Sequence, residues 1–95
     1  MSAYLIVDID VTDPVGYQAY RQMVGPIVEA GGGRFIVRGG AVDILEGDWR
    51  PQRVVVLEFP SMEAARQWYH GEGYAEAKAL RLRTAVCNVV LVEGL

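Results

Sequence analysis

The strand-like segments of this chain are apolar on both faces, yet the sequence offers too few helices to cover two faces of a sheet. Successive side chains of a strand point to opposite faces. In the first such segment both alternate sets contain apolar residues: Leu5, Val7, Ile9 and Val11 on one face, Tyr4 and Ile6 on the other. A sheet that is apolar on both sides must be covered on both sides. The chain's own helices can cover one face, and we expect a second copy of the sheet to cover the other, giving a homodimer.

Capping and turn residues divide the chain into two strand-helix-strand halves. We expect strands at 3–11, 34–38, 53–59 and 86–93, with a further extended stretch at 41–46. Helices are expected from Asp13-Pro14 to the glycines at 31–33, from Ser61 to about His70, and over 74–83, because aspartate or serine before a helix and proline at its first position are typical start signals. This order is typical of an α+β fold, the ferredoxin-like split β-α-β sandwich, with a four-stranded antiparallel sheet and helices on one face. We predict one such domain over residues 1–95.

Composition excludes several classes of function. Nine basic and twelve acidic residues give a net charge of −3 with no basic run, which argues against a nucleic-acid partner. The single cysteine, Cys87, and the single histidine, His70, cannot form a disulfide or a multi-histidine metal site within one chain. We therefore predict no metal and no cofactor. No apolar stretch approaches the ~20 residues of a membrane span, and no secretory signal is recognisable, so we expect a cytoplasmic protein without a membrane partner.

Arg38 is the first candidate ligand-binding residue. It ends a predicted strand directly before Gly39-Gly40, where a bend could turn its side chain into a cleft and let a ligand approach backbone N–H groups. A guanidinium there could hold a carboxylate or phosphate through two parallel hydrogen bonds. The alternative is that Arg38 forms an ion pair with a carboxylate of a neighbouring strand: Asp8, Asp10 or Glu58.

The same three carboxylates, Asp8, Asp10 and Glu58, are candidate catalytic groups. The fold makes their strands central neighbours, and carboxylates that crowd together raise one another's pKa, as an acid–base pair requires. Alternatively, they are solvated groups at strand ends. His70 is a further candidate base, although a cation at the end of a helix also suits the helix dipole.

Aromatic residues at helical spacing form a second candidate ligand-binding group: Tyr17, Tyr20, Trp68, Tyr69 and Tyr74. Between helices and sheet they could shape a pocket, and a buried hydroxyl could orient a ligand. The alternative is that they are ordinary core residues, as aromatic residues at this spacing often are.

Two segments carry a resemblance to a known family: Arg34-Phe35-Ile36-Val37-Arg38-Gly39-Gly40 and Glu46-Gly47-Asp48-Trp49. With Asp13-Pro14, Tyr17 and Tyr20 before them, and Trp68-Tyr69 and Tyr74 after them, the chain resembles the family known as domain of unknown function 1330. The resemblance implies a dimeric α+β barrel and supplies no reaction. Small monooxygenases and lactone isomerases share that superfamily, so an enzyme is implied by analogy only.

Three functions are compatible with these residues. The first is a homodimer that binds a small anionic metabolite, or acts on it as a cofactor-independent enzyme, with Arg38, Gly39, Gly40, Tyr20, Tyr69 and Tyr74 at the site. The second is a ligand-sensing or interaction module without turnover, and the third is a purely structural dimer. A pocket that reaches Arg38 and the tyrosines would favour the first two, and an acid–base group facing it would favour catalysis.

Overall fold

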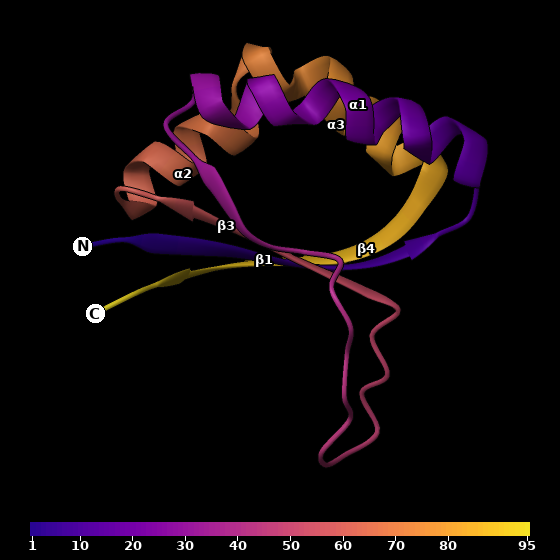
Figure 1. Cartoon of the computed structure of the whole chain (residues 1–95). Coiled ribbons are helices and arrows are strands. Elements are labelled where there is room, and N and C mark those ends of the chain that lie inside the picture. Colours follow the sequence, from indigo (N-terminus) through magenta and orange to yellow (C-terminus); the bar gives the residue numbers. More distant parts are fainter.

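The computed structural model describes residues 1–95 as four strands and three helices. In chain order the elements are β1 (Ala3–Val11), α1 (Pro14–Ala30), β2 (Arg34–Arg38), β3 (Arg53–Phe59), α2 (Met62–His70), α3 (Glu72–Thr84) and β4 (Ala85–Glu93). The strands form one antiparallel sheet in the order β2-β3-β1-β4, and all three helices lie on one face of it (Figure 1). The predicted ferredoxin-like fold is confirmed. No helix has both the length and the hydropathy that a membrane span requires.

The two faces of the sheet differ in how well this chain covers them. Leu5, Val7 and Ile9 of β1 lie beneath the helices and are at most 6% exposed. The opposite surface, which we call the helix-free face, carries the other alternate residues of the three longer strands: Tyr4, Ile6, Asp8, Asp10, Val54, Val56, Glu58, Val86, Asn88, Val90 and Val92. Val90 remains 58% exposed although it lies opposite Ile6 at the middle of β1. One chain therefore covers only one of its two apolar faces.

Side-chain caps fix the starts of α1 and α2. The carboxylate of Asp13 accepts a hydrogen bond from the backbone N–H of Gly16 at 3.2 Å, and the hydroxyl of Ser61 accepts one from Ala64 at 3.0 Å. Both starts agree with the sequence prediction. From Asp13 onward, the buried residues of α1 recur every three or four positions and form one apolar face: Tyr17, Tyr20, Val24 and Val28.

Helix α3 starts two residues earlier than predicted, at Glu72, so that only Gly71 separates it from α2. Glu72 and Gly73 occupy the first turn. There the backbone N–H groups need no intrahelical partner, and a negative charge suits the positive end of the helix dipole. The glycines around Glu72 therefore mark a junction between two helices and do not form a separate loop.

Residues 39–52 form a long arm without regular secondary structure, which extends from the sheet on the side away from the helices (Figure 1). The extended stretch expected at 41–46 lies in this arm and pairs with no strand of the sheet. Gly39 and Gly47 have φ of 74° and 87°, a conformation that glycine adopts without strain, and they bend the chain at the base and near the tip of the arm.

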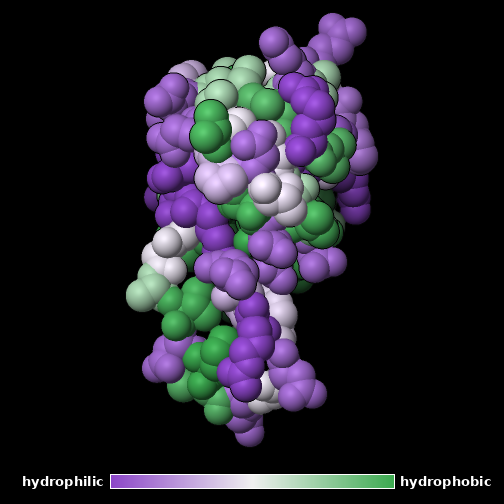
Figure 2. Space-filling view, turned by 90° about the vertical axis from the view of Figure 1, so that its right-hand side faces the viewer, coloured by the Kyte–Doolittle hydropathy of each residue, from purple (hydrophilic) through white to green (hydrophobic).

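Hydrophobic side chains are prominent on the surface of the arm (Figure 2). Leu45 is 86% exposed, Trp49 60% and Val42 42%. The indole N–H of Trp49 donates to the carboxylate of Asp8 at 2.9 Å, which ties the arm to the helix-free face. Exposed apolar side chains therefore occur both on the arm and on the helix-free face that it contacts.

Trp68 of α2 contacts residues of α1, α3 and β3. Its ring stacks on Tyr74 at 4.1 Å between centroids and lies 5.2 Å from the ring of Phe59. The indole N–H donates to the carbonyl of Ile27 at 3.0 Å, which ties α2 to α1. A Cβ at Gly31 would fall 2.1 Å from Cδ1 of this indole, so α1 ends in close contact with the ring.

Candidate functional site

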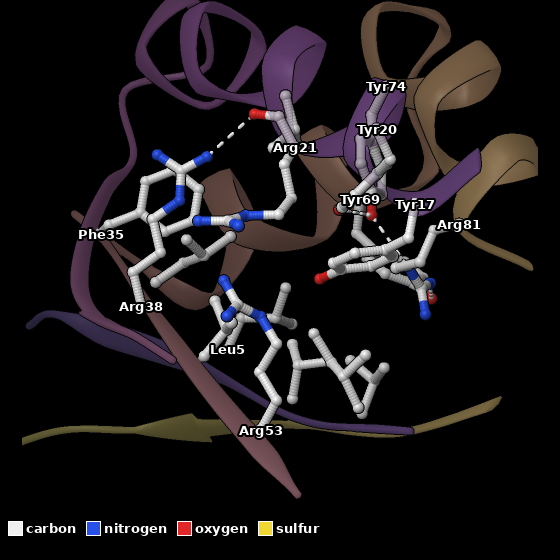
Figure 3. Close-up of a pocket in the computed structure, with 16 residues that line it drawn as sticks. Leu5, Tyr17, Tyr20, Arg21, Phe35, Arg38, Arg53, Tyr69, Tyr74 and Arg81 are labelled. Atoms are coloured by element: carbon white, nitrogen blue, oxygen red, sulfur yellow. Dashed lines mark hydrogen bonds between the residues drawn. The ribbon is translucent and has the colours of Figure 1, made fainter. Parts of the chain in front are cut away.

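A pocket lies between the helices and the sheet (Figure 3). Aliphatic side chains of the sheet, among them Leu5, Val7 and Leu57, form one wall of it. Its polar lining consists of four arginines and four tyrosines: Arg21, Arg38, Arg53, Arg81, Tyr17, Tyr20, Tyr69 and Tyr74. No carboxylate and no imidazole lines this pocket. The lining therefore carries positive charge and hydroxyl groups without a negative group to balance the charge.

Three arginines gather at one end of the pocket, which we call the arginine end: Arg21, Arg38 and Arg53 (Figure 3). The Arg38 guanidinium lies 4.1 Å from the ring centre of Phe35, and its Nη2 donates to the backbone carbonyl of Arg21 at 3.0 Å. Arg53, the first residue of β3, has a buried Nε with no hydrogen-bond partner. A buried donor without an acceptor costs about 1–3 kcal/mol, so an acceptor brought to Arg53 by a ligand would stabilise the site.

Gly39 sets how closely the arm can approach Arg53. A Cβ at Gly39 would fall 2.1 Å from Nη1 of Arg53, and the backbone N–H of Gly39 donates to the carbonyl of Val54 at 2.9 Å. Gly39 is thus in close contact with the Arg53 guanidinium, and no side chain would fit at this position. Gly40 lies in the arm, and a Cβ there would meet nothing within 4 Å.

Arg81 organises the other end of the pocket, which we call the tyrosine end. Its side chain comes from α3 and is only 3% exposed. Its Nε donates to the hydroxyl of Tyr74 at 3.1 Å, and its Nη2 donates to the hydroxyl of Tyr69 at 3.0 Å. The hydroxyls of Tyr74 and Tyr20 are 2.9 Å apart and share a further hydrogen bond. Arg81 therefore fixes the positions of three phenol groups, two of them directly and one through Tyr74.

The surroundings keep these groups in one protonation state. Burial raises the pKa of Tyr20 and of Tyr74, because a phenolate would lose its hydration, and the neighbouring phenol raises the pKa of Tyr20 further. Burial alone would lower the pKa of Arg81, but its interactions with Tyr74, Cys87 and Tyr69 together outweigh this effect, and the pKa of Arg81 is raised. Around neutral pH, Tyr20 and Tyr74 are therefore neutral hydroxyls beside a charged guanidinium.

The free volume of the pocket is about 30 Å³. That space accommodates roughly two water molecules. A larger ligand must therefore displace side chains, and Arg21 and Arg38 are the ones able to move, because both are exposed. One hydrogen bond to the Arg21 carbonyl and the contact with the Phe35 ring hold the Arg38 guanidinium in place. Moving this exposed side chain therefore costs little free energy.

Four of the six residues predicted to bind a ligand lie together in this pocket: Arg38, Tyr20, Tyr69 and Tyr74. The other two, Gly39 and Gly40, do not line it. Trp68, which was grouped with the tyrosines as a candidate pocket residue, belongs to the core, whereas Tyr17 does line the pocket. Which of these residues bind a ligand stays a prediction.

The three predicted carboxylates do not gather. Asp8 and Asp10 lie toward one end of β1, whereas Glu58 lies opposite Tyr4 near the other end. All three occupy the helix-free face, because they alternate with the buried residues of their strands. This separation keeps Glu58 away from the two aspartates, and none of the three forms an ion pair with Arg38. A catalytic role for any of them stays a prediction.

Glu58 and Asp8 have other partners on the helix-free face. Glu58 pairs with Arg34 and accepts a hydrogen bond from the hydroxyl of Tyr4 at 3.2 Å. The hydrogen bond from Arg34 is the main cause that lowers the pKa of Glu58. Asp8 accepts the indole N–H of Trp49. These carboxylates are therefore engaged in structural contacts.

His70 ends α2 outside the pocket. It is exposed, and its ring meets that of Tyr69 edge-on, with 5.2 Å between ring centres. It lines a neighbouring hollow of about 290 Å³ together with Arg66 and Leu91. The two hollows share Tyr69 in their walls, but His70 does not face the arginine end.

The sequence matches the model of a protein family over residues 2–95, nearly its whole length. The chain belongs to the family known as domain of unknown function 1330. The resemblance inferred from the Arg-Phe-x-Val-Arg-Gly-Gly and Glu-Gly-Asp-Trp segments is thereby confirmed. No curated protein sequence matches this member of the family.

Solved structures of other proteins share the fold. A protein of unknown function from Rhodopseudomonas palustris is 23% identical, with a TM-score of 0.77 over 99% of this chain and 82% of the other. A dimeric ferredoxin-like protein of unknown function from Jannaschia is 14% identical, with a TM-score of 0.70 over 99% of this chain and 100% of the other. SnoaB, a cofactor-independent oxygenase from Streptomyces nogalater, is 9% identical, with a TM-score of 0.68 over 99% and 93%. At these identities the likeness shows the fold alone.

The sequence-based predictions did not include three of the arginines that line the pocket, although their spacing in the sequence indicates their positions. Arg21 lies four residues after Tyr17, about one helical turn further along α1, and Arg53 falls in the same alternate set as Val55 and Leu57. Arg81 lies seven residues after Tyr74, two helical turns on and therefore on the same face of α3. Extending each apolar pattern to the arginine at its end would have found all three.

Proposed function

We propose that this protein binds a small organic anion in the pocket between its helices and its sheet. The observation that carries the proposal is the buried Nε of Arg53, a charged donor without an acceptor in a pocket that no carboxylate lines. Arg53 as a whole is partly buried, but its Nε is fully enclosed, and an enclosed donor without an acceptor is costly. A carboxylate or phosphate group on a ligand would supply the missing partner, and the planar guanidinium can hold two of its oxygens at once.

The wall of the pocket limits the rest of the ligand. Twelve of the sixteen lining residues are hydrophobic or aromatic, so the body of the anion is apolar. The small free volume favours a ligand of modest size that moves Arg21 and Arg38 as it enters. A small aromatic or unsaturated acid fits both requirements.

We further propose that the protein acts as a homodimer through its helix-free face. Val86, Val90 and Val92 of β4 leave apolar side chains exposed on that face, as Leu45 and Trp49 do on the arm, and large exposed apolar patches mark interaction sites. The dimeric ferredoxin-like protein from Jannaschia supports the same assembly, since its fold covers this chain almost completely. In such a dimer, the arm of one protomer would lie along its partner.

Binding without turnover and catalysis are both compatible with this pocket. The likeness of the fold to SnoaB, a cofactor-independent oxygenase, favours catalysis. The residues favour binding, because no carboxylate or imidazole faces the ligand and burial raises the pKa of Tyr20 and Tyr74. We therefore propose anion binding as the function, with an oxygenase as the second candidate.

Thermal melting with matched acids and amides tests the proposal. Benzoate is expected to raise the melting temperature and benzamide is not, because only the acid gives Arg53 a charged acceptor. A ligand at 100 times its Kd stabilises the folded state by about 2.7 kcal/mol. Arg38→Lys should weaken benzoate binding about tenfold, because lysine keeps the charge and loses the planar fork.

The lysine variant should melt like the parent without ligand, because Arg38 is exposed and its replacement leaves the core unchanged. Equal stabilisation by benzoate and benzamide would contradict an anion site. Full affinity for benzoate in the Arg38→Lys protein would remove Arg38 from it.

A further inference from the structure

The tyrosine end of the pocket has hydroxyl protons that no protein group accepts. Each phenol carries one O–H donor. Tyr20 and Tyr74 share one proton between their oxygens, so one of their two protons is left over, whichever hydroxyl donates. The Tyr69 hydroxyl accepts from Arg81, and its own proton has no acceptor in the protein. Two of the three hydroxyl protons at this end are therefore free for a ligand.

Arg81 makes these hydroxyls stronger donors. Its guanidinium donates to the oxygens of Tyr74 and Tyr69, which draws electron density away from their O–H bonds. If Tyr74 in turn donates to Tyr20, the same polarisation reaches the Tyr20 proton, since the two oxygens are 2.9 Å apart. Burial raises the pKa of Tyr20 and Tyr74, so both keep their protons. This arrangement is suited to an oxygen that carries negative charge in a site shielded from water.

The two ends of the pocket differ in kind. At the arginine end the donors are charged guanidinium groups that suit a full anion, with Arg38 and Arg53 facing the pocket. At the tyrosine end the free donors are neutral hydroxyls backed by a buried cation, because Arg81 already uses Nε and Nη2 on Tyr74 and Tyr69. Apolar side chains of the sheet lie between the ends (Figure 3).

We propose that the tyrosine end is an oxyanion-binding subsite for a second oxygen of the same ligand. This inference rests on the proposed anion binding at the arginine end. The ligand class is then a planar unsaturated acid with its carboxylate at one end and a phenol or enol oxygen at the other, such as a hydroxybenzoate. The subsite stabilises the ionised form of that oxygen through the hydroxyls of Tyr69 and of Tyr20 or Tyr74.

A pair of dyes that differ in one hydroxyl tests the subsite. Para-hydroxy-meta-nitrobenzoate carries a phenol whose ionisation changes its visible absorbance, and meta-nitrobenzoate lacks the hydroxyl. Both are titrated into the full-length protein at a pH equal to the pKa of the free phenol. We expect the hydroxylated acid to bind about tenfold more tightly, because hydrogen bonds to a charged oxygen are strong, and its absorbance to shift toward the phenolate on binding.

Two tyrosine variants provide the comparison. Tyr69→Phe removes a free hydroxyl from the subsite and leaves the ring in place, whereas Tyr4→Phe removes a hydroxyl on the helix-free face. We expect Tyr69→Phe to lose most of the tenfold preference and of the absorbance shift, with less than a twofold change for meta-nitrobenzoate. Tyr4→Phe should behave as the parent does.

The outcomes separate this inference from the proposed function. If the parent binds both acids with equal affinity, or binds the phenol without an absorbance shift, the subsite is refuted and the anion site stands. If Tyr69→Phe keeps the full preference, the subsite is refuted as well. Binding of neither acid would overturn the proposed function and the subsite with it.

Discussion

Replacing Val90 by aspartate is expected to convert the proposed dimer into a monomer of 10.5 kDa. Val90 lies on the helix-free face of the edge strand β4, opposite Ile6 at the middle of β1, and is 58% exposed in the single chain. The substitution therefore leaves the fold of one protomer intact, but it would bury an unpaired charge in an apolar contact between two copies. Multi-angle light scattering at micromolar concentration measures the mass directly.

Val15→Asp is the matched control for this experiment. Val15 is 85% exposed on the first turn of α1, away from the helix-free face, and an acidic residue there suits the helix dipole. This variant should keep the mass of the parent. A parent protein of 10.5 kDa at micromolar concentration would refute the dimer, and a Val90→Asp protein that remains dimeric would place the interface elsewhere.

Truncating Trp68 to alanine should destabilise the protein by roughly 3–5 kcal/mol, the usual cost of removing a large aromatic side chain from a core. The ring contacts Tyr74 and Phe59, and its N–H holds the Ile27 carbonyl at the end of α1. Trp68→Phe should lose less, because an aromatic ring remains. Urea unfolding of both variants gives the two free energies of unfolding.

Leu82→Ala serves as the surface control. Leu82 is 63% exposed on α3, so its truncation should change the free energy of unfolding by no more than about 0.5 kcal/mol. If the Trp68→Ala protein loses no more stability than the Leu82→Ala protein, the contacts of Trp68 with α1, α3 and β3 do not stabilise the fold.

The regular part of the fold could be predicted because local rules determine it. The bounds of β1, β2 and β3 follow from alternation and from flanking glycines and prolines, and the starts of α1 and α2 follow from Asp13 and Ser61. The 41–46 segment has the composition of a strand, but a strand also needs a pairing partner, and no periodic pattern reveals that one is missing.

The site was harder to predict because it depends on which face each charged residue occupies. Arg38 and the four tyrosines were found from strand ends and helical spacing. The carboxylates were misplaced, since Asp8 and Glu58 are on adjacent strands but several residues apart in the antiparallel register. The hydrogen bonds of Arg81 to Tyr69 and Tyr74 depend on how α2 and α3 pack together, which sequence spacing does not specify.

Titration calorimetry with benzoate on Arg53→Gln and Arg83→Gln tests anion binding in the pocket most directly. Both variants lose one positive charge, but Arg53 lies in the pocket and Arg83 is exposed near the end of α3. We predict at least a tenfold loss of affinity for Arg53→Gln, because a charge-assisted hydrogen bond is lost, and less than a twofold loss for Arg83→Gln. Equal affinities in the two variants would show that the anion binds outside the pocket, or only through the overall charge of the protein.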